Sequence, residues 1–288
     1  MDALSAIANV NAWKKGDKRA PHKPLLMLYA IAQLSRGIKD NTFEAVDKNL
    51  SKLLLDFGPP NPTKATYPFL RLANDGIWSV TATENIITTK DYGKGHLLEV
   101  KATGSFTTEM ERALQDANTQ RQAIEFLLQE NFPESLHEDI LNALGIDLNV
   151  ALTNHKRKRR DPEFRQRVLE AYERRCAICG FQIRRDDQVV GVEAAHIKWH
   201  QAGGPDVEQN GVAMCTMHHK LFDYGLFAID NELKLKVSTK ANGGYGLKEW
   251  LLRFHNQELQ RPVKRNFYPE PEFTQWQVNE VFKGSYRD

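Results

Sequence analysis

AAHIKWHQAGGPDVEQNGVAMCTMHHKLFDYGLF, residues 194–227, and CAIC, residues 176–179, decide how the C-terminal part of this 288-residue chain folds. The chain has three cysteines, and all of them lie in these two segments. A structural zinc ion takes four tetrahedral ligands from Cys and His. A redox C-x-x-C motif or cysteines in a core would explain the first pair alone, but not the second half-site. The spacing therefore predicts a structural Zn²⁺ site made of Cys176, Cys179, Cys215 and His218.

The order of the polar residues between and after these half-sites resembles the HNH endonuclease family, in particular its McrA-like branch. The resemblance covers roughly residues 160–235 and implies a ββα-metal nuclease fold. It also implies a catalytic set formed by His196, Asn210 and His219. Many members of the family carry a metal-binding Asp just before the first His, where this chain has Ala195. The resemblance therefore leaves Glu193 and Asp223 as candidates for a further ligand.

The chemistry of phosphodiester cleavage explains these residue types. Histidine exchanges protons near neutral pH, so His196 is the candidate general base. A divalent ion, Mg²⁺ or Mn²⁺, would neutralise charge on the phosphate and on the departing oxygen, and His219 would hold it. The amide of Asn210 is too weakly basic for proton transfer, so we expect it to orient the loop between the two histidines.

Two strings near the N-terminus carry a second resemblance. RAPHKPLLMLYAI, residues 19–31, and YPFLRLANDGIW, residues 67–78, resemble the sulfur-binding domain that precedes HNH modules in phosphorothioation-dependent type IV restriction enzymes. The similarity spans roughly residues 1–150. It implies that the partner is double-stranded DNA in which sulfur replaces a non-bridging phosphate oxygen. It leaves open whether the chain acts as a monomer or a homodimer.

The residues of these strings suit contacts to DNA. Basic side chains and a helix start can meet phosphate groups. An apolar loop disfavours a hydrated oxygen and accepts a weakly hydrated sulfur. A polar pair in an Asn-Asp-Gly turn lies close by. The candidate DNA-binding residues are Arg19, His22, Lys23, Tyr67, Pro68, Arg71, Asn74 and Asp75.

The fold class expected for the whole chain is α+β. We predict a mixed α+β DNA-reading module with a helical connector over 1–150, a basic linker over 151–160, and the HNH domain over 161–288. Net charge is +2, with basic segments on both sides of an acidic middle, which suits a polyanionic partner. The linker run HKRKRR, residues 155–160, fits a phosphate-contacting clamp and a solubilising linker equally well.

Hydrophobic periodicity and turn residues predict the elements. Helices are expected over 22–36, 42–57, three segments of 107–145, 161–172, 215–224 and 271–283. Strands are expected over 76–81, 97–103 and 188–197, with a hairpin over 226–238. A Pro-rich loop is expected over 58–69, with Tyr67 and Pro68 inside it.

The chain has no run of about 18 apolar residues and no secretory signal pattern, so we expect no membrane span. Cysteines used for metal suggest a reducing cytoplasm. Two other functions are compatible with these motifs. The first is an HNH endonuclease that reads another mark, such as a methylated base, or unmodified DNA. The second is a non-catalytic, zinc-stabilised DNA-binding protein.

Overall fold

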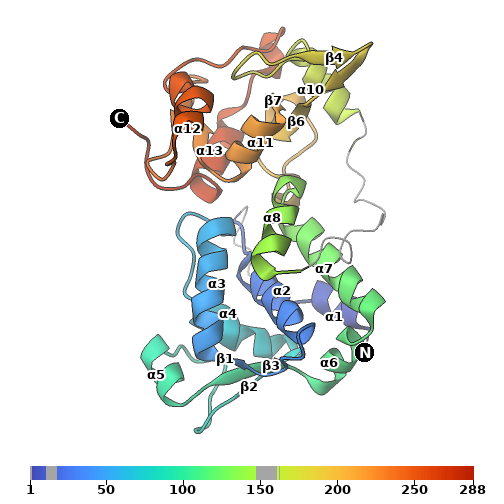
Figure 1. Cartoon of the computed structure of the whole chain (residues 1–288), viewed down its shortest axis with the longest axis vertical. Coiled ribbons are helices and arrows are strands. Elements are labelled where there is room, and N and C mark those ends of the chain that lie inside the picture. Colours follow the sequence, from blue (N-terminus) through green and yellow to red (C-terminus); the bar gives the residue numbers. More distant parts are fainter. Residues whose placement is uncertain (1, 11–17, 147–160, 162) are drawn as a thin grey trace. The chain divides into compact units, whose positions relative to one another are not determined.

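The computed structural model describes residues 2–10, 18–146, 161 and 163–288. The chain separates into two compact units, Met1–Asn154 and His155–Asp288 (Figure 1). The predicted linker, 151–160, lies outside the described residues. Both units combine helices with small antiparallel sheets, so the predicted α+β class is confirmed. No helix of the described part of the chain is long and apolar enough to span a membrane.

The N-terminal unit is built around helix α2 (His22–Leu34), which is buried along most of its length. Its sequence, HKPLLMLYAIAQL, has almost no polar face, and a helix that is apolar on every side is stable only when other elements enclose it. Four helices pack against it: α3 (Phe43–Phe57), α4 (Thr66–Arg71), α7 (Ala117–Asn131) and α8 (Glu134–Leu144).

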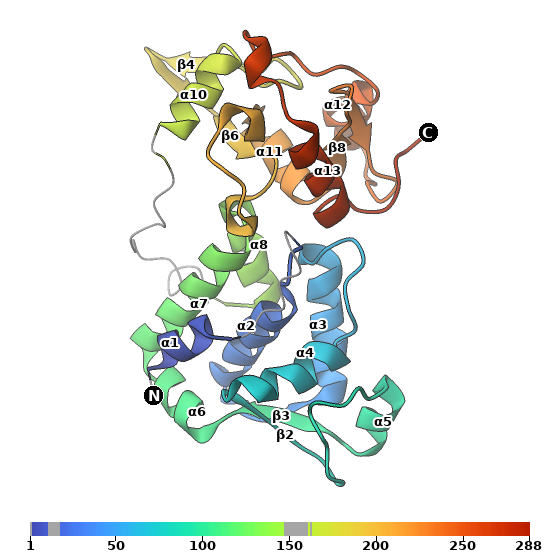
Figure 2. The same ribbon diagram turned by 180° about the vertical axis from the view of Figure 1, so that it is seen from behind.

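A three-stranded antiparallel sheet forms one end of this unit (Figures 1 and 2). The strand order is β1–β3–β2, with Thr42 opposite Thr103 and Trp78 opposite Phe106. The strands are β1 (Asn41–Thr42), β2 (Trp78–Thr81) and β3 (Thr103–Phe106). The remaining helical segments in the described residues of this unit are α1 (Ala3–Ala8), η1 (Leu72–Asp75), α5 (Lys94–Glu99) and α6 (Thr108–Leu114).

Two predictions for the N-terminal unit are wrong. Residues 97–99 of the strand expected over 97–103 form the end of helix α5, because the buried residues Leu97 and Val100 are three apart, which is a helical spacing. Of the expected strand, Thr103 alone lies in a strand, β3. Tyr67 and Pro68, which were expected in the loop over 58–69, lie in helix α4, whereas residues 58–65 have no helix or strand. Proline is tolerated there because it stands in the first turn, where the backbone N–H has no partner within the helix.

The C-terminal unit has the predicted ββα arrangement. Strand β6 (Val192–His196) pairs antiparallel with β7 (Gly211–Cys215), and helix α11 (Thr216–Asp223) follows directly and packs on both strands. Helix α10 (Phe164–Ala171) also packs on this pair. Ala195 is fully buried in the core between these elements, and its methyl group offers no ligand to a metal ion.

Shorter elements make up the rest of this unit over residues 163–288. Two further hairpins are present, and the one predicted over 226–238 is confirmed. The hairpin strands are β4 (Ile183–Arg185), β5 (Gln188–Val190), β8 (Phe227–Ile229) and β9 (Leu235–Val237). The helical segments are η2 (His200–Ala202), η3 (Glu208–Asn210), α12 (Tyr245–Trp250), η4 (Leu252–Phe254), η5 (Arg265–Phe267) and α13 (Pro271–Glu280).

Two boundaries in this unit differ from the prediction. The strand expected over 188–197 is divided at Gly191, whose φ of 72° is in the left-handed region and ends the pairing of β5. The helix expected from Asp161 begins at Phe164. Asp161 still contributes to its start, because its side chain accepts a hydrogen bond from the backbone N–H of Glu163.

Candidate active site and metal centre

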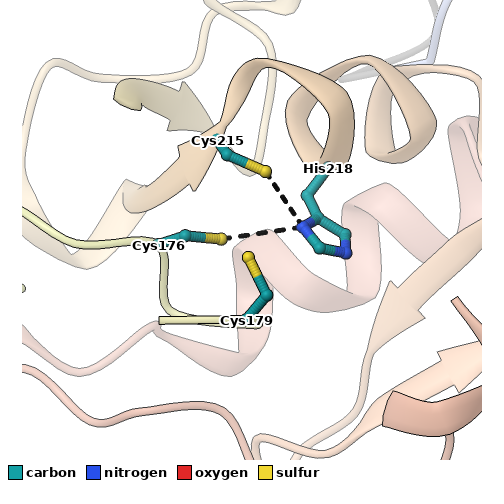
Figure 3. Close-up of side chains that lie close together, drawn as sticks. All are labelled: Cys176, Cys179, Cys215 and His218. Carbon is teal, nitrogen blue, oxygen red and sulfur yellow. Dashed lines mark hydrogen bonds between the residues drawn. The ribbon is translucent and has the colours of Figure 1, made fainter. Parts of the chain in front are cut away.

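The side chains of Cys176, Cys179, Cys215 and His218 converge on one point (Figure 3). Their candidate ligand atoms all lie within 4.8 Å of one another. The first two cysteines come from the turn after helix α10, and the other two residues come from the start of α11. Hydrogen bonds from the side chains of Cys179 and Cys215 lower the pKa of the Cys176 thiol. The cluster therefore has the donor set and the compactness of a metal site.

The imidazole of His218 is held in the tautomer that a metal ligand needs. Its Nε2 lies 2.8 Å from the carbonyl oxygen of Trp250 and donates to it. Its Nδ1 faces the sulfurs, 3.1 Å from Cys215 Sγ and 3.7 Å from Cys176 Sγ. A ligating histidine usually donates its other N–H to such a carbonyl. The geometry therefore fits a cation bound through Nδ1.

His196 ends strand β6 and is packed between two groups. The ring of Phe164 stacks on it with centroids 4.1 Å apart and an interplanar angle of 19°. Its Nε2 lies 2.7 Å from Oδ1 of Asp206. Burial acts to raise the pKa of Asp206, but hydrogen bonds from the Asp161 N–H and from His196 lower it below its usual value. Asp206 is therefore a carboxylate near neutral pH.

Asn210 is fully buried and organises the loop between the two strands. Its Oδ1 accepts from the backbone N–H of Lys198 at 2.8 Å. Its Nδ2 donates to the carbonyl oxygens of Lys198 and Pro205, each at 3.0 Å. The amide thus connects the residues that follow His196 to the end of the loop.

His219 lies on helix α11 between two carboxylates. Its Nδ1 is 2.6 Å from Oε2 of Glu193, and its Nε2 is 3.2 Å from Oδ2 of Asp223. The Glu193 side chain is 46% exposed, whereas that of Asp223 is 1% exposed and also accepts from Nε1 of Trp199 at 2.9 Å. The hydrogen bond from His219 is the main cause of the lowered pKa of Glu193. One carboxylate therefore faces solvent and the other is anchored inside.

The basic residues at the start of helix α2 make internal contacts. The Arg19 guanidinium donates to the carbonyl oxygen of Phe57 at 2.7 Å, at the end of helix α3. The Lys23 ammonium lies 2.6 Å from the carboxylate of Asp75, and these side chains are only 12% and 7% exposed. These three predicted DNA-binding residues therefore tie the ends of α2, α3 and η1 together.

Two of the other predicted DNA-binding residues line an open depression of about 550 Å³. Tyr67, which is 43% exposed, and Arg71 line it, with the guanidinium 5.5 Å from the ring centroid. Arg71 also pairs at 2.6 Å with Asp91, another lining residue. Pro68 is buried beneath the helix surface. Asn74 accepts from the Thr88 hydroxyl at 2.9 Å.

His22 supports one wall of this depression without lining it. Its Nε2 accepts from the backbone N–H of Thr63 at 3.0 Å, and Thr63 is a lining residue. Burial, with a smaller effect from Arg19, lowers the pKa of His22 to about 4. The imidazole is therefore neutral near pH 7, and it acts here as an acceptor.

Three residues that contact the predicted site residues were not predicted from the sequence. Phe164 and Asp206 contact His196, and Trp199 contacts the candidate metal ligand Asp223. Phe164 occupies an ordinary apolar position of an amphipathic helix, and Trp199 is typical of a core residue. Asp206 lies in the string GGPDVEQN between His196 and Asn210, so its position in the motif was the available signal. The spacing of residues in the sequence does not predict these contacts, because each contact joins two different secondary-structure elements or a loop and such an element.

Comparison with known proteins defines the class of both units. Residues 1–149 match the model of the ScoMcrA-like DNA sulfur-binding domain, and residues 176–230 match the model of the HNH endonuclease domain. The chain thus joins a DNA-reading unit to a nuclease unit, which is the composition of a modification-dependent DNA endonuclease. It belongs to the family of proteins with a ScoMcrA-like DNA sulfur-binding domain. Both resemblances stated from the sequence are confirmed.

Several solved structures are similar to this chain at low sequence identity. The sulfur-binding domain of SprMcrA complexed with phosphorothioated DNA is 20% identical, with a TM-score of 0.43, over 50% of this chain and 93% of that one. The type IV phosphorothioation-dependent restriction endonuclease ScoMcrA is 19% identical, with a TM-score of 0.39, over 52% and 35% of the chains. The modification-dependent TagI restriction endonuclease is 23% identical, with a TM-score of 0.31, over 47% and 41%. No curated protein matches the chain.

Proposed function

We propose that the N-terminal unit recognises phosphorothioated double-stranded DNA and that the C-terminal unit hydrolyses a phosphodiester bond nearby. The observation that carries this proposal is the pairing of a DNA sulfur-binding domain with an HNH domain in which His196, Asn210 and His219 occupy one ββα unit. The sulfur-binding domain of SprMcrA has phosphorothioated DNA as its bound partner.

The residues of the nuclease unit have separate tasks in this proposal. His196 takes a proton from water while the water oxygen forms a bond to phosphorus. The bond from phosphorus to the 3′ oxygen breaks, and the leaving oxygen takes a proton from solvent. Asn210 does not exchange protons. It fixes the loop that follows His196, so the base keeps its place relative to helix α11.

His219 and Glu193 are proposed to hold the divalent ion. Glu193 and Ala195 lie on the same face of strand β6, since alternate residues of a strand point to the same side. Glu193 can thus offer the carboxylate that Ala195 lacks, while buried Asp223 orients the imidazole from its other nitrogen. A bound Mg²⁺ or Mn²⁺ would supply charge neutralisation at the phosphate and the leaving oxygen.

The Cys₃His cluster is proposed to bind structural Zn²⁺. Three sulfurs and one imidazole nitrogen are ligands that zinc prefers, and the compact cluster leaves no position for substrate. It joins the turn after α10 to the start of α11, which carries His219. The cluster needs reduced thiols, which fits a cytoplasmic protein.

Recognition of sulfur is proposed to take place at the depression beside Tyr67 and Arg71. The exposed Tyr67 ring offers an apolar surface, and the guanidinium of Arg71 lies over that ring. Sulfur is more weakly hydrated than oxygen, so it loses less hydration free energy when it contacts an aromatic ring. Selection by one such group amounts to about 1–3 kcal/mol, and contacts to other phosphates must supply the remaining affinity.

Binding of the full chain to paired duplexes, identical except for one sulfur atom, tests the recognition step. The wild type should bind the sulfur duplex more tightly, and Tyr67→Ser should reduce that difference. Arg71→Ala should weaken binding to both duplexes and lower the salt slope by about one unit, as loss of a phosphate contact does. Lys52→Ala, at an exposed position of α3, is the matched control. Equal wild-type affinity for both duplexes would favour a reader of another mark.

Cleavage assays with divalent metal test the nuclease step. His196→Ala should lower the cleavage rate by about 10²–10⁴-fold, the usual contribution of a general base, while DNA binding stays unchanged. His219→Ala should also abolish cleavage and keep the zinc. A wild-type chain that binds DNA but cuts no duplex under any divalent ion would indicate a non-catalytic DNA-binding protein.

A further inference from the structure

The carboxylate of Asp206, a loop residue, contacts the imidazole of His196. The proposed function gives this carboxylate no role. Oδ1 of Asp206 is 2.7 Å from Nε2 of His196, and the two side chains are only 15% and 11% exposed. A hydrogen bond between a carboxylate and a largely enclosed ring is strong and directional. The contact crosses ten residues of sequence and joins the loop to the end of strand β6.

The carboxylate of Asp206 is itself held in place from the start of the nuclease unit. Its Oδ2 accepts from the backbone N–H of Asp161 at 2.8 Å. The Arg167 guanidinium donates to the backbone carbonyl of Asp206 at 2.8 Å and also pairs with Asp161 at 2.7 Å and Glu208 at 3.2 Å. Each carboxylate oxygen therefore has one fixed partner, so the group cannot rotate without losing a bond.

This arrangement determines which nitrogen of His196 is basic. A carboxylate only accepts hydrogen bonds, so Nε2 must carry the hydrogen and the lone pair of the neutral ring lies on Nδ1. Phe164 stacks on the ring at 4.1 Å and restrains its rotation. We propose that Asp206 is a positioning residue for DNA cleavage, which keeps His196 in the tautomer whose Nδ1 takes the proton from water. This inference rests on the proposed role of His196 as the general base.

The proton count is complete without a change of charge on Asp206. Water loses one proton to Nδ1 as its oxygen bonds to phosphorus, and the bond to the 3′ oxygen breaks. The proton on Nε2 stays on that nitrogen, and the ring becomes an imidazolium beside the carboxylate. Asp206 stabilises this positive charge and does not become protonated, as a carboxylate does when it orients a catalytic histidine.

Asp206→Asn is the decisive variant because the fixed partners dictate how the amide must lie. The Asp161 N–H requires an oxygen, so the amide NH₂ would face Nε2 of His196. That contact forces the hydrogen of the ring to Nδ1, which is the wrong tautomer for the proposed step. We expect kcat to fall by about 10²-fold or more, within the range for loss of a general base. KM, DNA affinity and the thermal midpoint should stay close to those of the wild type.

Asp206→Ala separates this role from a structural one. If the side chain only held the loop, the isosteric Asn variant would retain activity and the Ala variant would lose it. The proposal predicts the opposite order, with Asn at least as inactive as Ala. Asp187→Asn, at an exposed position of the β4–β5 turn, is the matched control and should keep the wild-type rate.

His196→Ala in the same assay distinguishes failure of the inference from failure of the proposed function. If His196→Ala is inactive while Asp206→Asn cuts at the wild-type rate, the positioning role is wrong and the base assignment stands. If Asp206→Ala cuts faster than the wild type, Nε2 is the basic nitrogen and the proposal is overturned. If His196→Ala keeps full activity, the proposed function fails together with the inference.

Discussion

The side chain of Asn210 supplies hydrogen bonds that the backbone of its loop cannot make. It serves one backbone N–H and two carbonyl groups and is fully buried. Each buried polar group left without a partner destabilises a fold by about 1–3 kcal/mol. We therefore expect Asn210→Ala to lower the unfolding free energy of the nuclease unit by at least about 2 kcal/mol and to abolish cleavage.

Chemical denaturation of the full chain measures this loss of unfolding free energy. Hydrogen exchange of the backbone amides of strand β7 measures it within the nuclease unit. Asn231→Ala provides the control, because Asn231 is an exposed residue of the β8–β9 turn. An Asn210→Ala chain with wild-type stability would show that the loop does not depend on this amide.

His22 gives the N-terminal unit a dependence on pH with a definite sign. Its pKa is lowered in the fold to about 4, from 6.5 for the free side chain. The unfolded chain therefore binds a proton first as the pH falls, and stability present above pH 6.5 is lost toward pH 4. The difference corresponds to about 3 kcal/mol.

The unfolding free energy of this unit at about pH 7 and about pH 4.5, in the wild type and in His22→Gln, measures that contribution. The variant should show a smaller loss between the two pH values than the wild type. His96→Gln removes a partly exposed imidazole, and in this variant the unfolding free energy should change with pH as it does in the wild type. If His22→Gln and the wild type lost the same unfolding free energy between the two pH values, burial of His22 would not be the cause of the pH dependence.

At the scale of elements, the Cys₃His cluster links the C-x-x-C turn to helix α11. Because the cluster draws on two segments far apart in the sequence, metal binding contributes directly to folding of the unit. Purified protein should contain about one zinc per chain. Removal of the metal by a chelator, or Cys179→Ser, should abolish the cooperative thermal transition of the nuclease unit. A metal-free chain that keeps this transition would contradict a structural site.

The motif-bearing elements could be predicted because their signals are local. The hairpin over 226–238 and helix α11 follow from turn residues and periodicity within one segment. Helix α5 could not be predicted, because a short apolar run fits a strand and a helix equally well. Only the fold shows that Leu97 and Val100, which are three residues apart, are the buried ones. Helix α4 was missed because Pro68 signals a loop unless it falls in the first turn of a helix.

The sequence suggests members for the candidate site, but it does not suggest which of them contact one another. The order of His196, Asn210 and His219 follows from the motif. The contacts with Asp206 and Phe164 join separate elements, and spacing carries no information about them. The ion pair between Lys23 and Asp75 could not be predicted for the same reason. The sequence suggests each residue as a DNA contact, whereas in the fold the two side chains form an ion pair with each other.

At the scale of the whole molecule, the proposed function depends on both units acting on one DNA. Sulfur recognition by the first unit must direct hydrolysis by the second, so a defect in either unit should abolish selective cleavage. Tyr67→Ser and His196→Ala separate these defects. The first should reduce selection of the sulfur duplex while the nuclease residues remain intact, and the second should keep selective binding without cleavage.

Cleavage of a duplex with a single site-defined phosphorothioate, beside the same duplex with ordinary phosphate, is the most direct test. The full wild-type chain, loaded with zinc and supplied with Mg²⁺ or Mn²⁺, should cut the sulfur duplex near the modified position and leave the ordinary duplex intact. His196→Ala should cut neither. Equal rates on the two duplexes, or no cleavage of any sulfur duplex across sequence contexts, would contradict a sulfur-directed HNH endonuclease.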